Sequence, residues 1–293
     1  MSAQKNWKRL SLNPQKTHRE VALDLAGAGI ENAAQEAYWL LQESLGVSRK
    51  ELLTSRGISL TLEQQNRLND WILRRKQREP LQYILGCADF RRITISIDRR
   101  ALIPRPETEG LVELALEKIR RLNSPSVLDV GTGSGVIALS ILCEHPTACV
   151  TACDISPEAL QLACENSARL GISNRVLWWK ADLFSPDFTA LFDQRFDCLV
   201  SNPPYISNGE FQNLQPEIRL YEPAGALLAG DEGLDFIRRL AEIGREMISE
   251  GGSLFCEIGE TQGEAALDEF LRRGWRAIVK KDLSGKDRYI AAE

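Results

Sequence analysis

The sequence predicts a two-part α/β protein, in which a small helical bundle precedes a larger domain with a mainly parallel sheet. From about Ser124 onward, short apolar segments alternate with helical stretches, and this order implies a parallel sheet covered by helices on both faces. The first 85 residues instead carry helix-start signals and no strand alternation. A chain of 293 residues is long enough to divide in this way.

Two capping boxes place helices in the predicted bundle, which spans residues 1–85. Ser48 is followed by Glu51, and Thr61 is followed by Gln64 at the same spacing. In such a box, each side chain satisfies a backbone N–H group at the start of a helix. The basic run near the end of the bundle is more typical of a solvated helix end than of a nucleic-acid surface.

A β-hairpin is expected to link the bundle to the larger domain over residues 86–103. Ile93, Ile95 and Ile97 alternate with polar neighbours, which indicates a strand with one solvated face. A helix begins soon afterwards, because Pro106 suits a first helical turn. The larger domain is therefore expected over residues 104–293.

The larger domain contains seven apolar segments that we expect to form strands: SVLDV, ACVTACD, VLWWKAD, FDCLVSN, GGSLFCEIG, WRAIVKK and RYIAA. Helices are expected between them at about residues 136–144, 157–170, 234–248 and 263–273. Ser156 before Pro157 signals a helix start, and Gly171 and Gly274 stand where glycine commonly ends a helix.

Composition excludes several classes of protein. The net charge of −5 and pI of about 5.4 argue against a dedicated duplex-DNA binder, and no direct nucleic-acid contact is expected. The seven cysteines are odd in number, show no C-x-x-C spacing and lie mostly in apolar runs. We interpret them as reduced core residues, without disulfides or a zinc site. With only His18 and His145 in the chain, a histidine-based metal centre is not expected either.

The distribution of apolar residues predicts a cytoplasmic protein. The first ten residues contain no apolar core of signal-peptide length, and no apolar run approaches the length needed to span a membrane.

A glycine-rich loop lies between the first strand and first helix of the predicted sheet. Gly131, Gly133 and Gly135 form the turn in VLDVGTGSGVIAL, where a ligand can approach the backbone and the helix N-terminus. The loop also fits G-x-G-x-x-A, with the acidic Asp154 closing the next strand, so a dinucleotide and S-adenosylmethionine are both compatible with it. A tight turn without a ligand is the plainer alternative.

Polar side chains end successive strands of the predicted sheet. Asp154 could accept both hydroxyls of a ribose. Asp182 could accept a bond from the exocyclic amine of adenine, with Leu183 packing on the ring, or it could simply cap the next segment. Because the carboxyl ends of parallel strands are where ligands bind in open α/β sheets, Asn202 belongs to the same predicted nucleoside site.

The stretch Asn202 to Tyr205 favours methyl transfer over hydride transfer. Consecutive prolines stop the strand and leave a stiff corner. The side-chain oxygen of Asn202 and the carbonyl of Pro203 can each accept an N–H from a planar NH2 group, which would align its nitrogen with a sulfonium methyl. Tyr205 could hold a planar substrate by stacking. The proton relay that a nicotinamide enzyme needs is not visible at this edge, although a simple turn remains an alternative.

Six motifs together resemble the release factor glutamine methyltransferases, the PrmC/HemK family, along nearly the whole chain. They are PLQYILG, LIPRPETE, DVGTGSG, SNPPYI, YEPAGAL and EIGETQG. Asn-Pro-Pro-Tyr alone also occurs in adenine-N6 methyltransferases, but LIPRPETE ahead of the glycine loop makes the match specific. Two departures lie outside the reacting centre: CADFRRI replaces a Glu-Phe-Trp-like stretch, and Leu183 stands where a tryptophan sometimes occurs.

The resemblance implies a Rossmann-like class I S-adenosylmethionine-dependent methyltransferase fold with a seven-stranded sheet, joined to the helical bundle by the hairpin. It implies methylation of the side-chain amide nitrogen (N5) of the glutamine in the Gly-Gly-Gln motif of class 1 peptide chain release factors, with S-adenosyl-L-homocysteine as product. An adenine-N6 methyltransferase acting on DNA or RNA is the alternative. A monomer is expected, and the helical bundle would dock the protein substrate.

The resemblance also implies roles for individual residues. The residues expected to bind S-adenosylmethionine are Gly131, Thr132, Gly133, Ser134, Gly135, Asp154, Asp182, Leu183 and Asn202. Those expected to hold the substrate glutamine and act in catalysis are Asn202, Pro203, Pro204 and Tyr205, with the segment from Arg105 to Glu109, Arg105 and Glu107 above all, lining the site. No metal is expected.

Overall fold

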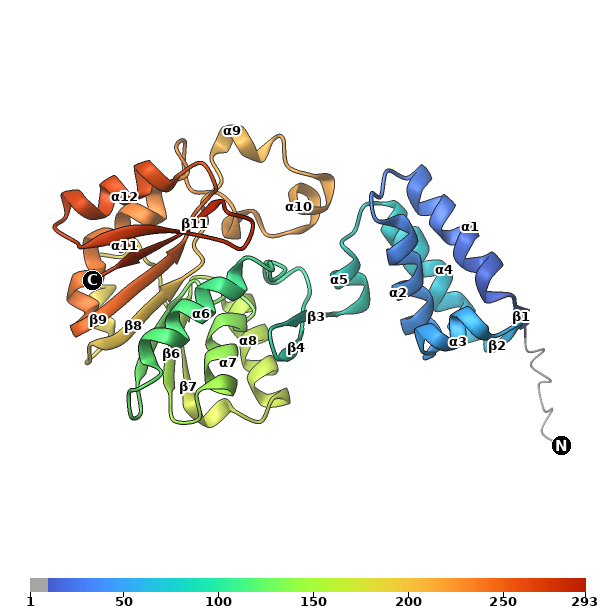
Figure 1. The fold of residues 1–293 in the computed structure, drawn as a ribbon, viewed down its shortest axis with the longest axis horizontal. Coiled ribbons are helices and arrows are strands. Elements are labelled where there is room, and N and C mark those ends of the chain that lie inside the picture. Colours follow the sequence, from blue (N-terminus) through green and yellow to red (C-terminus); the bar gives the residue numbers. More distant parts are fainter. Residues whose placement is uncertain (1–9) are drawn as a thin grey trace. The chain divides into compact units, whose positions relative to one another are not determined.

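The computed structural model describes residues 10–293 and divides the chain into two compact units, with the boundary between Gly86 and Cys87 (Figure 1). The part of the predicted bundle that precedes residue 10 lies outside the described residues. No helix among residues 10–293 combines the length and the apolar character needed to span a bilayer.

Helices dominate the first unit, as the sequence predicts. They are α1 (Pro14–Gly27), α2 (Ala33–Leu45), α3 (Arg49–Thr54), α4 (Leu62–Lys76) and α5 (Leu81–Leu85). Both predicted capping boxes are confirmed, at the starts of α3 and α4.

The first unit also contains two short strands that the prediction of a helical bundle did not include. Short strands β1 (Leu10–Leu12) and β2 (Ile58–Leu60) pair antiparallel, with Leu12 opposite Ile58. Three residues are too few to show the period-two alternation by which a strand is recognised in sequence.

A buried ion pair lies between two helices of the first unit. The Arg75 Nε of α4 donates to Glu36 Oε2 of α2 at 2.5 Å, and the exposed fractions of the two side chains are only 6% and 13%. Around it, apolar residues of all five helices form one core that includes Leu25, Leu40 and Leu41. The pair therefore joins two helices at a site with little access to water.

Replacing Glu36 by alanine is expected to lower the free energy of unfolding of the first unit by about 3 kcal/mol, because it removes a charged partner of a buried guanidinium. Chemical denaturation of the whole protein measures the change. Glu43 lies exposed on the same helix, and Glu43→Ala should change stability by less than about 0.5 kcal/mol. Equal effects of the two substitutions would contradict the prediction.

The predicted hairpin is present as β3 (Cys87–Phe90) and β4 (Ile93–Ser96), which pair antiparallel and belong to the second unit. Its strands end at Ser96, before the expected limit of 103. Two hydrogen bonds attach it to the rest of the second unit: the backbone N–H of Ser96 donates to Asn166 Oδ1, and Asn166 Nδ2 donates to the carbonyl of Ser96.

The second unit contains a seven-stranded sheet with the order β10-β11-β9-β8-β5-β6-β7 (Figure 1). Its strands are β5 (Ser126–Val130), β6 (Cys149–Asp154), β7 (Val176–Lys180), β8 (Phe196–Ser201), β9 (Ile248–Glu257), β10 (Ala277–Lys281) and β11 (Asp287–Ala292). Strands β5 to β9 run parallel, whereas β11 pairs antiparallel with both β9 and β10. The mainly parallel sheet of the predicted fold is confirmed.

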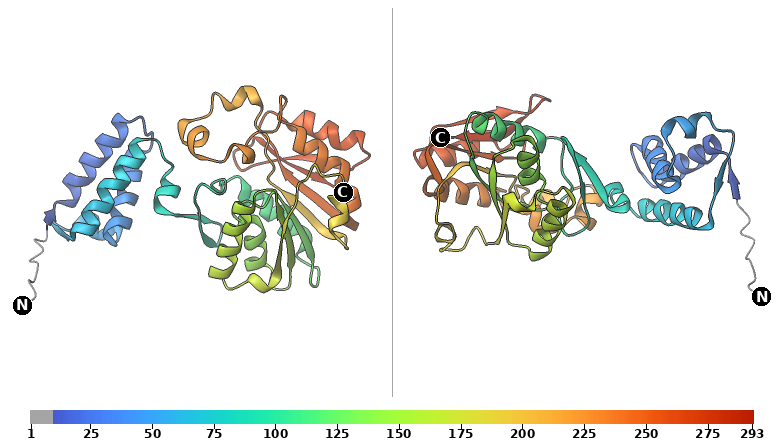
Figure 2. Two further views of the ribbon diagram at one scale, coloured as in Figure 1. Left: turned by 180° about the vertical axis from the view of Figure 1, so that it is seen from behind. Right: turned by 90° about the horizontal axis from the view of Figure 1, so that it is seen from below.

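Helices cover the two faces of this sheet (Figure 2). Helices α6 (Thr108–Ile119) and α7 (Val136–Glu144) pack on each other, and α8 (Pro157–Arg169) contacts β6 and β7. Helices α11 (Asp235–Met247) and α12 (Gly263–Arg272) pack together over a core that includes Leu128, Leu199 and Leu254.

Two short helices that the sequence analysis did not include, α9 (Asn208–Phe211) and α10 (Pro216–Tyr221), lie between β8 and α11. They belong to the long connection that follows the Asn-Pro-Pro-Tyr stretch.

The interpretation of the cysteines as core residues is wrong for three of them. All seven are free, and Cys153, Cys198 and Cys256 are buried in strands, but Cys143, Cys149 and Cys164 are exposed. Cys143 and Cys164 lie on the outer sides of helices α7 and α8, where the apolar composition of the flanking sequence does not reveal which face a residue occupies.

Candidate active site

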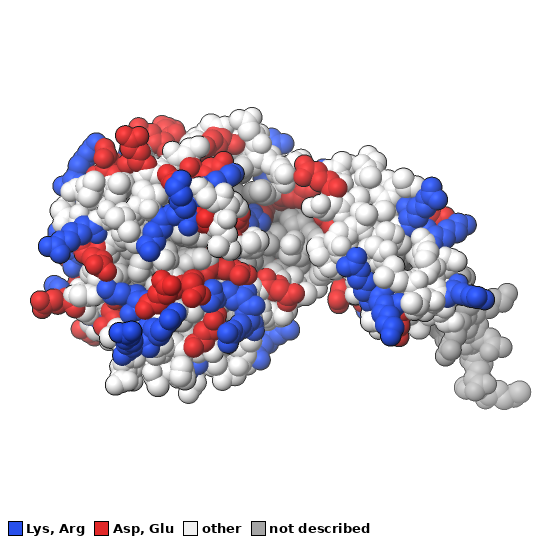
Figure 3. Space-filling view, in the orientation of Figure 1, with Lys and Arg blue, Asp and Glu red and all other residues white. Residues whose placement is uncertain are grey.

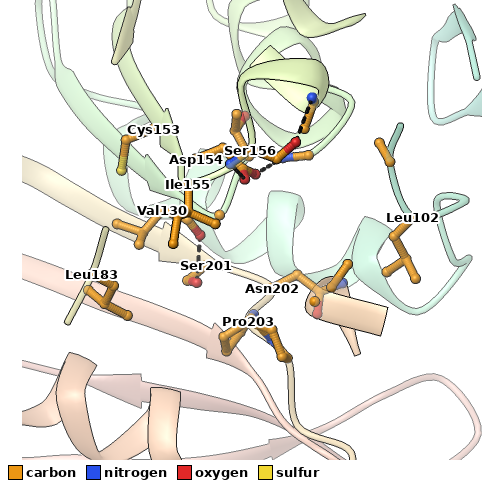
Figure 4. A pocket seen from close by; sticks show the side chains of 18 of the residues that line it. Leu102, Val130, Cys153, Asp154, Ile155, Ser156, Leu183, Ser201, Asn202 and Pro203 are labelled. Carbon is orange, nitrogen blue, oxygen red and sulfur yellow. Dashed lines mark hydrogen bonds between the residues drawn. The ribbon is translucent and has the colours of Figure 1, made fainter. Parts of the chain in front are cut away.

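A cavity of about 260 Å³ lies at the carboxyl ends of β5, β6 and β8. In Figure 4, the side chains of Asp154, Leu183 and Asn202 come from three separate segments of the chain around the cavity. The sequence-predicted residues that line it are Gly131, Thr132, Gly133, Ser134, Asp154, Asp182, Leu183, Asn202, Pro203 and Pro204. Leu102, Pro104 and Thr108 add a wall from the segment that enters α6. The predicted convergence of strand ends is present.

The glycine loop is held in shape by hydrogen bonds from its own backbone. The N–H groups of Gly131 and Thr132 both donate to the carbonyl of Cys153, which closes β6 against the loop. Asp129 Oδ2 accepts from Thr132 Oγ1 at 2.7 Å and from the N–H of Ala138 at 3.2 Å. Complete burial raises the pKa of Asp129 to about 7, since a charge there is poorly solvated.

Glycine is required at position 135 by the packing of the chain, whereas the sequence analysis expected it to contact a cofactor. It begins α7 at a φ of +82°, and a Cβ atom there would come within 3.0 Å of Ala163 Cβ and 3.1 Å of Trp178 Cη2. The absence of a side chain thus lets α7 pack closely against α8 and β7. Gly135 does not contribute to the lining of the cavity.

Asp154 connects the end of β6 to the glycine loop. Its Oδ2 accepts from the N–H of Gly133 at 2.8 Å, and its Oδ1 accepts from the N–H of Ser156 at 3.0 Å (Figure 4). Burial raises the pKa of Asp154 above its ordinary value, while the backbone donors act in the opposite direction. Each oxygen keeps a lone pair, so the carboxylate can still accept hydroxyl groups from the cavity.

Asp182 both caps a turn and lines the cavity, so it fits the two interpretations that the sequence left open. Its Oδ1 accepts from the N–H of Phe184 at 2.9 Å, which caps the turn after β7. The side chain is nevertheless exposed and lines the cavity beside Leu183. Phe188, fully buried behind them, completes an apolar wall that sequence reasoning did not include.

The corner after β8 is anchored on both sides. Ser201, the last residue of the strand, donates through Oγ to the carbonyl of Val130 in the neighbouring strand β5 at 2.7 Å (Figure 4). Asn202 then donates through Nδ2 to Thr108 Oγ1 at 3.0 Å. Within residues 10–293, neither Asn202 Oδ1 nor the carbonyl of Pro203 accepts a hydrogen bond. Two acceptors are therefore available at the corner.

Tyr205 lies beyond the cavity lining, and its side chain is half-buried. Its hydroxyl donates to Glu257 Oε1 at 3.3 Å, and burial raises the pKa of the hydroxyl, so it stays protonated. Its backbone carbonyl accepts from Gln262 Nε2 at 2.9 Å. Tyr205 therefore supports the corner from behind in this structure.

Arg105 and Glu107 are also placed outside the cavity lining. Arg105 Nη2 donates to Glu222 Oε1 at 2.5 Å, and the other oxygen of Glu222 accepts from the N–H of Ile103. Glu107 is exposed at the start of α6, and its carbonyl accepts from the hydroxyl of Tyr289. The ion pair between Arg105 and Glu222 joins the segment before α6 to the segment that follows α10.

Sequence reasoning did not single out three residues that contact the corner: Thr108, Glu257 and Gln262. Thr108 Oγ1 donates to Glu257 Oε2 at 2.8 Å, while Glu257 is 1% exposed. Gln262 ties the corner to the next loop through its bonds to the carbonyls of Tyr205 and Gly233. All three residues lie in motifs that carried the family resemblance, LIPRPETE and EIGETQG, and this was the only signal available for them.

Comparison with known proteins places both units in one family. Residues 17–86 match the model of the PrmC N-terminal domain, and residues 112–239 match that of the methyltransferase small domain. A release factor glutamine methyltransferase of Geobacter sulfurreducens is 41% identical over 267 residues, covering 91% of each chain. One from Salmonella typhimurium is 37% identical over 260 residues, covering 88% of this chain and 91% of the relative.

Solved structures agree on the fold. The hMettl16 catalytic domain superimposes with a TM-score of 0.51 at 17% identity, covering 81% of this chain and 84% of that one. The delta-N METTL16 MTase domain gives the same TM-score at 18% identity, covering 68% of this chain and 87% of that one. At this identity the likeness concerns the methyltransferase fold alone.

Proposed function

The chain belongs to the release factor glutamine methyltransferases, and we propose that its site methylates the side-chain amide nitrogen (N5) of the glutamine in the Gly-Gly-Gln motif of class 1 peptide chain release factors. The observation that carries this proposal is the pair of free acceptors at the corner, Asn202 Oδ1 and the Pro203 carbonyl. A primary amide presents two N–H groups in one plane, and two acceptors are what such a group needs.

S-adenosylmethionine is the methyl donor, and it supplies a methyl group on a sulfonium that leaves as neutral S-adenosyl-L-homocysteine. The residues that line the cavity fit it. Asp154 would accept the ribose hydroxyls, and Gly131 and Gly133 leave the backbone open to close approach. Asp182 and Leu183 would receive the adenine, with the apolar wall of Phe188 behind them.

The corner would act on the acceptor amide by position and by hydrogen bonding. Conjugation draws the lone pair of an amide nitrogen towards its carbonyl, so the planar group is a weak nucleophile. Acceptors at Asn202 Oδ1 and the Pro203 carbonyl would hold the two N–H groups and favour the pyramidal nitrogen of the transition state. The nitrogen gains the methyl group and loses one of these protons to water.

An adenine-N6 methyltransferase would use the same corner but is not favoured. The relatives that match over both units are named for glutamine methylation of release factors. On the face of the second unit drawn in Figure 3, acidic and basic side chains are interspersed and form no continuous basic surface. A nucleic-acid strand requires such a surface to balance its phosphates.

The first unit would dock the protein substrate. A single glutamine side chain offers little binding surface, so affinity must come from contacts remote from the reacting nitrogen. Residues 17–86 match a domain that accompanies the methyltransferase domain in this family. We place the reaction in the cytoplasm, where release factors work, and expect the enzyme to act as a monomer.

A methyl-transfer assay with labelled S-adenosylmethionine tests the proposal. Purified release factor should take up label, and the same factor with its Gly-Gly-Gln glutamine changed to alanine should take up none. Duplex and single-stranded DNA and an RNA hairpin serve as competing acceptors and should remain unlabelled. Label on nucleic acid alone, with the intact release factor unlabelled, would contradict the proposed substrate and favour adenine-N6 methylation at this corner.

A further inference from the structure

We propose that Glu257 is a positioning residue for methyl transfer: through Thr108 it sets which end of the Asn202 carboxamide faces the acceptor amide. The inference rests on the proposed role of the corner and names residues that act on it from behind. Its basis is a chain of hydrogen bonds in which each donor has one acceptor within reach.

The chain begins at a carboxylate that can only accept. Glu257 ends β9 and is 1% exposed, and its two oxygens accept from two different hydroxyls. Thr108 Oγ1 donates to Oε2 at 2.8 Å, and the Tyr205 hydroxyl donates to Oε1 at 3.3 Å. An ionised carboxylate has no proton to offer, so both hydroxyls must direct their protons at it.

The direction of the Thr108 proton decides the next bond. A threonine hydroxyl has one proton and two lone pairs. Once its proton points at Glu257, Thr108 Oγ1 can only accept from Asn202, and it does so from Nδ2 at 3.0 Å. The Asn202 amide is thereby turned so that Oδ1 faces away from Thr108. This is the orientation in which Oδ1 is free for the N–H of the substrate.

Protonation of Glu257 would reverse the direction of the hydrogen bonds from Asn202 through Thr108 to Glu257. A protonated carboxyl could donate to Thr108 Oγ1, whose own proton would then point at Asn202 and attract Oδ1. The amide would flip and present Nδ2, a donor, to the N–H groups of the substrate. Two donors facing each other cannot bond, so the acceptor amide would lose its alignment.

The surroundings of Glu257 put this event near neutral pH. Burial raises the pKa of Glu257 to about 7, opposed by the hydroxyls of Thr108 and Tyr205 and by the charge of Arg288 on β11. Glu107 at the start of α6 raises the pKa further by like charge. Tyr289, whose hydroxyl is bound by the carbonyl of Glu107, stays neutral because burial raises its pKa to about 12. The rate should therefore fall as the pH drops below about 7.

The test is the pH dependence of kcat for Glu257→Gln, measured with saturating release factor between about pH 5.5 and about pH 9. Glutamine keeps the shape of the side chain but places an N–H donor at Thr108 or Tyr205 and does not titrate. We expect kcat at high pH to fall by about 10- to 100-fold, with the Kd of S-adenosylhomocysteine and the Tm nearly unchanged. The acidic limb of the profile that the native enzyme shows should also disappear.

Thr108 provides a second, independent test. Thr108→Val removes the relay and should lower kcat by a similar factor, whereas Thr108→Ser keeps the hydroxyl and should restore most of it. The double variant Glu257→Gln with Thr108→Val should be no worse than either single variant, because both break the same chain. Glu144→Gln is the matched control: this carboxylate is also largely buried and bonded to Arg91, but lies at the far end of α7.

The outcomes separate this inference from the proposed function. If Asn202→Ala abolishes transfer while Glu257→Gln keeps the native kcat and the native acidic limb, the corner works but Glu257 does not position it. If Asn202→Ala retains full activity, the corner itself is not the acceptor site and the proposed function fails. An acidic limb that persists in Glu257→Gln would point to Asp129, whose pKa is also raised to about 7, and would overturn the inference.

Discussion

Replacing Asn202 by alanine is expected to lower kcat for release factor methylation by about 10²- to 10³-fold, because it removes one of two acceptors aimed at the reacting nitrogen. The strand end should survive, since Ser201 Oγ remains bound to the carbonyl of Val130. The Kd of S-adenosylhomocysteine should therefore change by less than about tenfold. Single-turnover kinetics with labelled donor measure the chemical step, and calorimetric titration measures the binding.

Asn202→Asp tests whether the Nδ2 group of Asn202 is needed as well as its oxygen. Aspartate keeps one oxygen for the substrate but places a second oxygen against Thr108 Oγ1, which in the native enzyme accepts the N–H of Asn202. We expect a loss as large as that of the alanine variant. The matched control is Asn174→Ala, at an exposed position in the turn before β7, which should retain full activity. Native activity in Asn202→Ala would contradict the assignment of the corner.

Replacing Asp154 by alanine is expected to weaken the binding of S-adenosylmethionine by about 100-fold. Two effects combine. The carboxylate that would accept the ribose hydroxyls is lost, and the N–H groups of Gly133 and Ser156 lose the acceptor that fixes the loop around the cavity. At saturating donor, kcat should recover to within about tenfold of the native value, because the corner that holds the acceptor amide is untouched.

Equilibrium dialysis or calorimetry with S-adenosylhomocysteine gives the Kd directly. Asp154→Asn should be nearly as weak, since its NH2 group opposes a backbone N–H. Asp193→Asn is the control, because Asp193 is exposed in the loop before β8, at the opposite edge of the sheet from the cavity. A Kd unchanged in Asp154→Ala would show that the donor lies elsewhere, and the assignment of the cavity would have to be abandoned.

Much of the fold could be predicted because its signals are local. Strand β5, the glycine loop and helix α7 follow one another within VLDVGTGSGVIAL, and the positive φ angles of Gly131, Gly133 and Gly135 are the backbone conformations that favour glycine. The capping boxes of α3 and α4 are equally local. Strands β1 and β2 escaped notice because three-residue strands carry no periodic pattern.

The individual roles in the site were less predictable. Gly135 is required by the packing of α7 against Ala163 and Trp178, which a motif cannot distinguish from contact with a ligand. Arg105 is drawn to Glu222, a partner 117 positions away in the sequence, and so lies outside the cavity lining. Asp182 both caps its turn and lines the cavity, so the two interpretations of it were never exclusive.

The sequence by itself determined that a mainly parallel sheet would bring a glycine loop, two aspartates and an Asn-Pro-Pro-Tyr corner to one edge, because strand ends and turns are encoded by neighbouring residues. Only the tertiary structure decided how the Asn202 amide is oriented. Thr108 and Glu257 are separated by 149 positions, and Asn202 and Thr108 by 94, so no local pattern relates them. The direction of a proton between buried groups depends on which partners packing brings within hydrogen-bond distance, and that is settled only when β8, β9 and α6 come together.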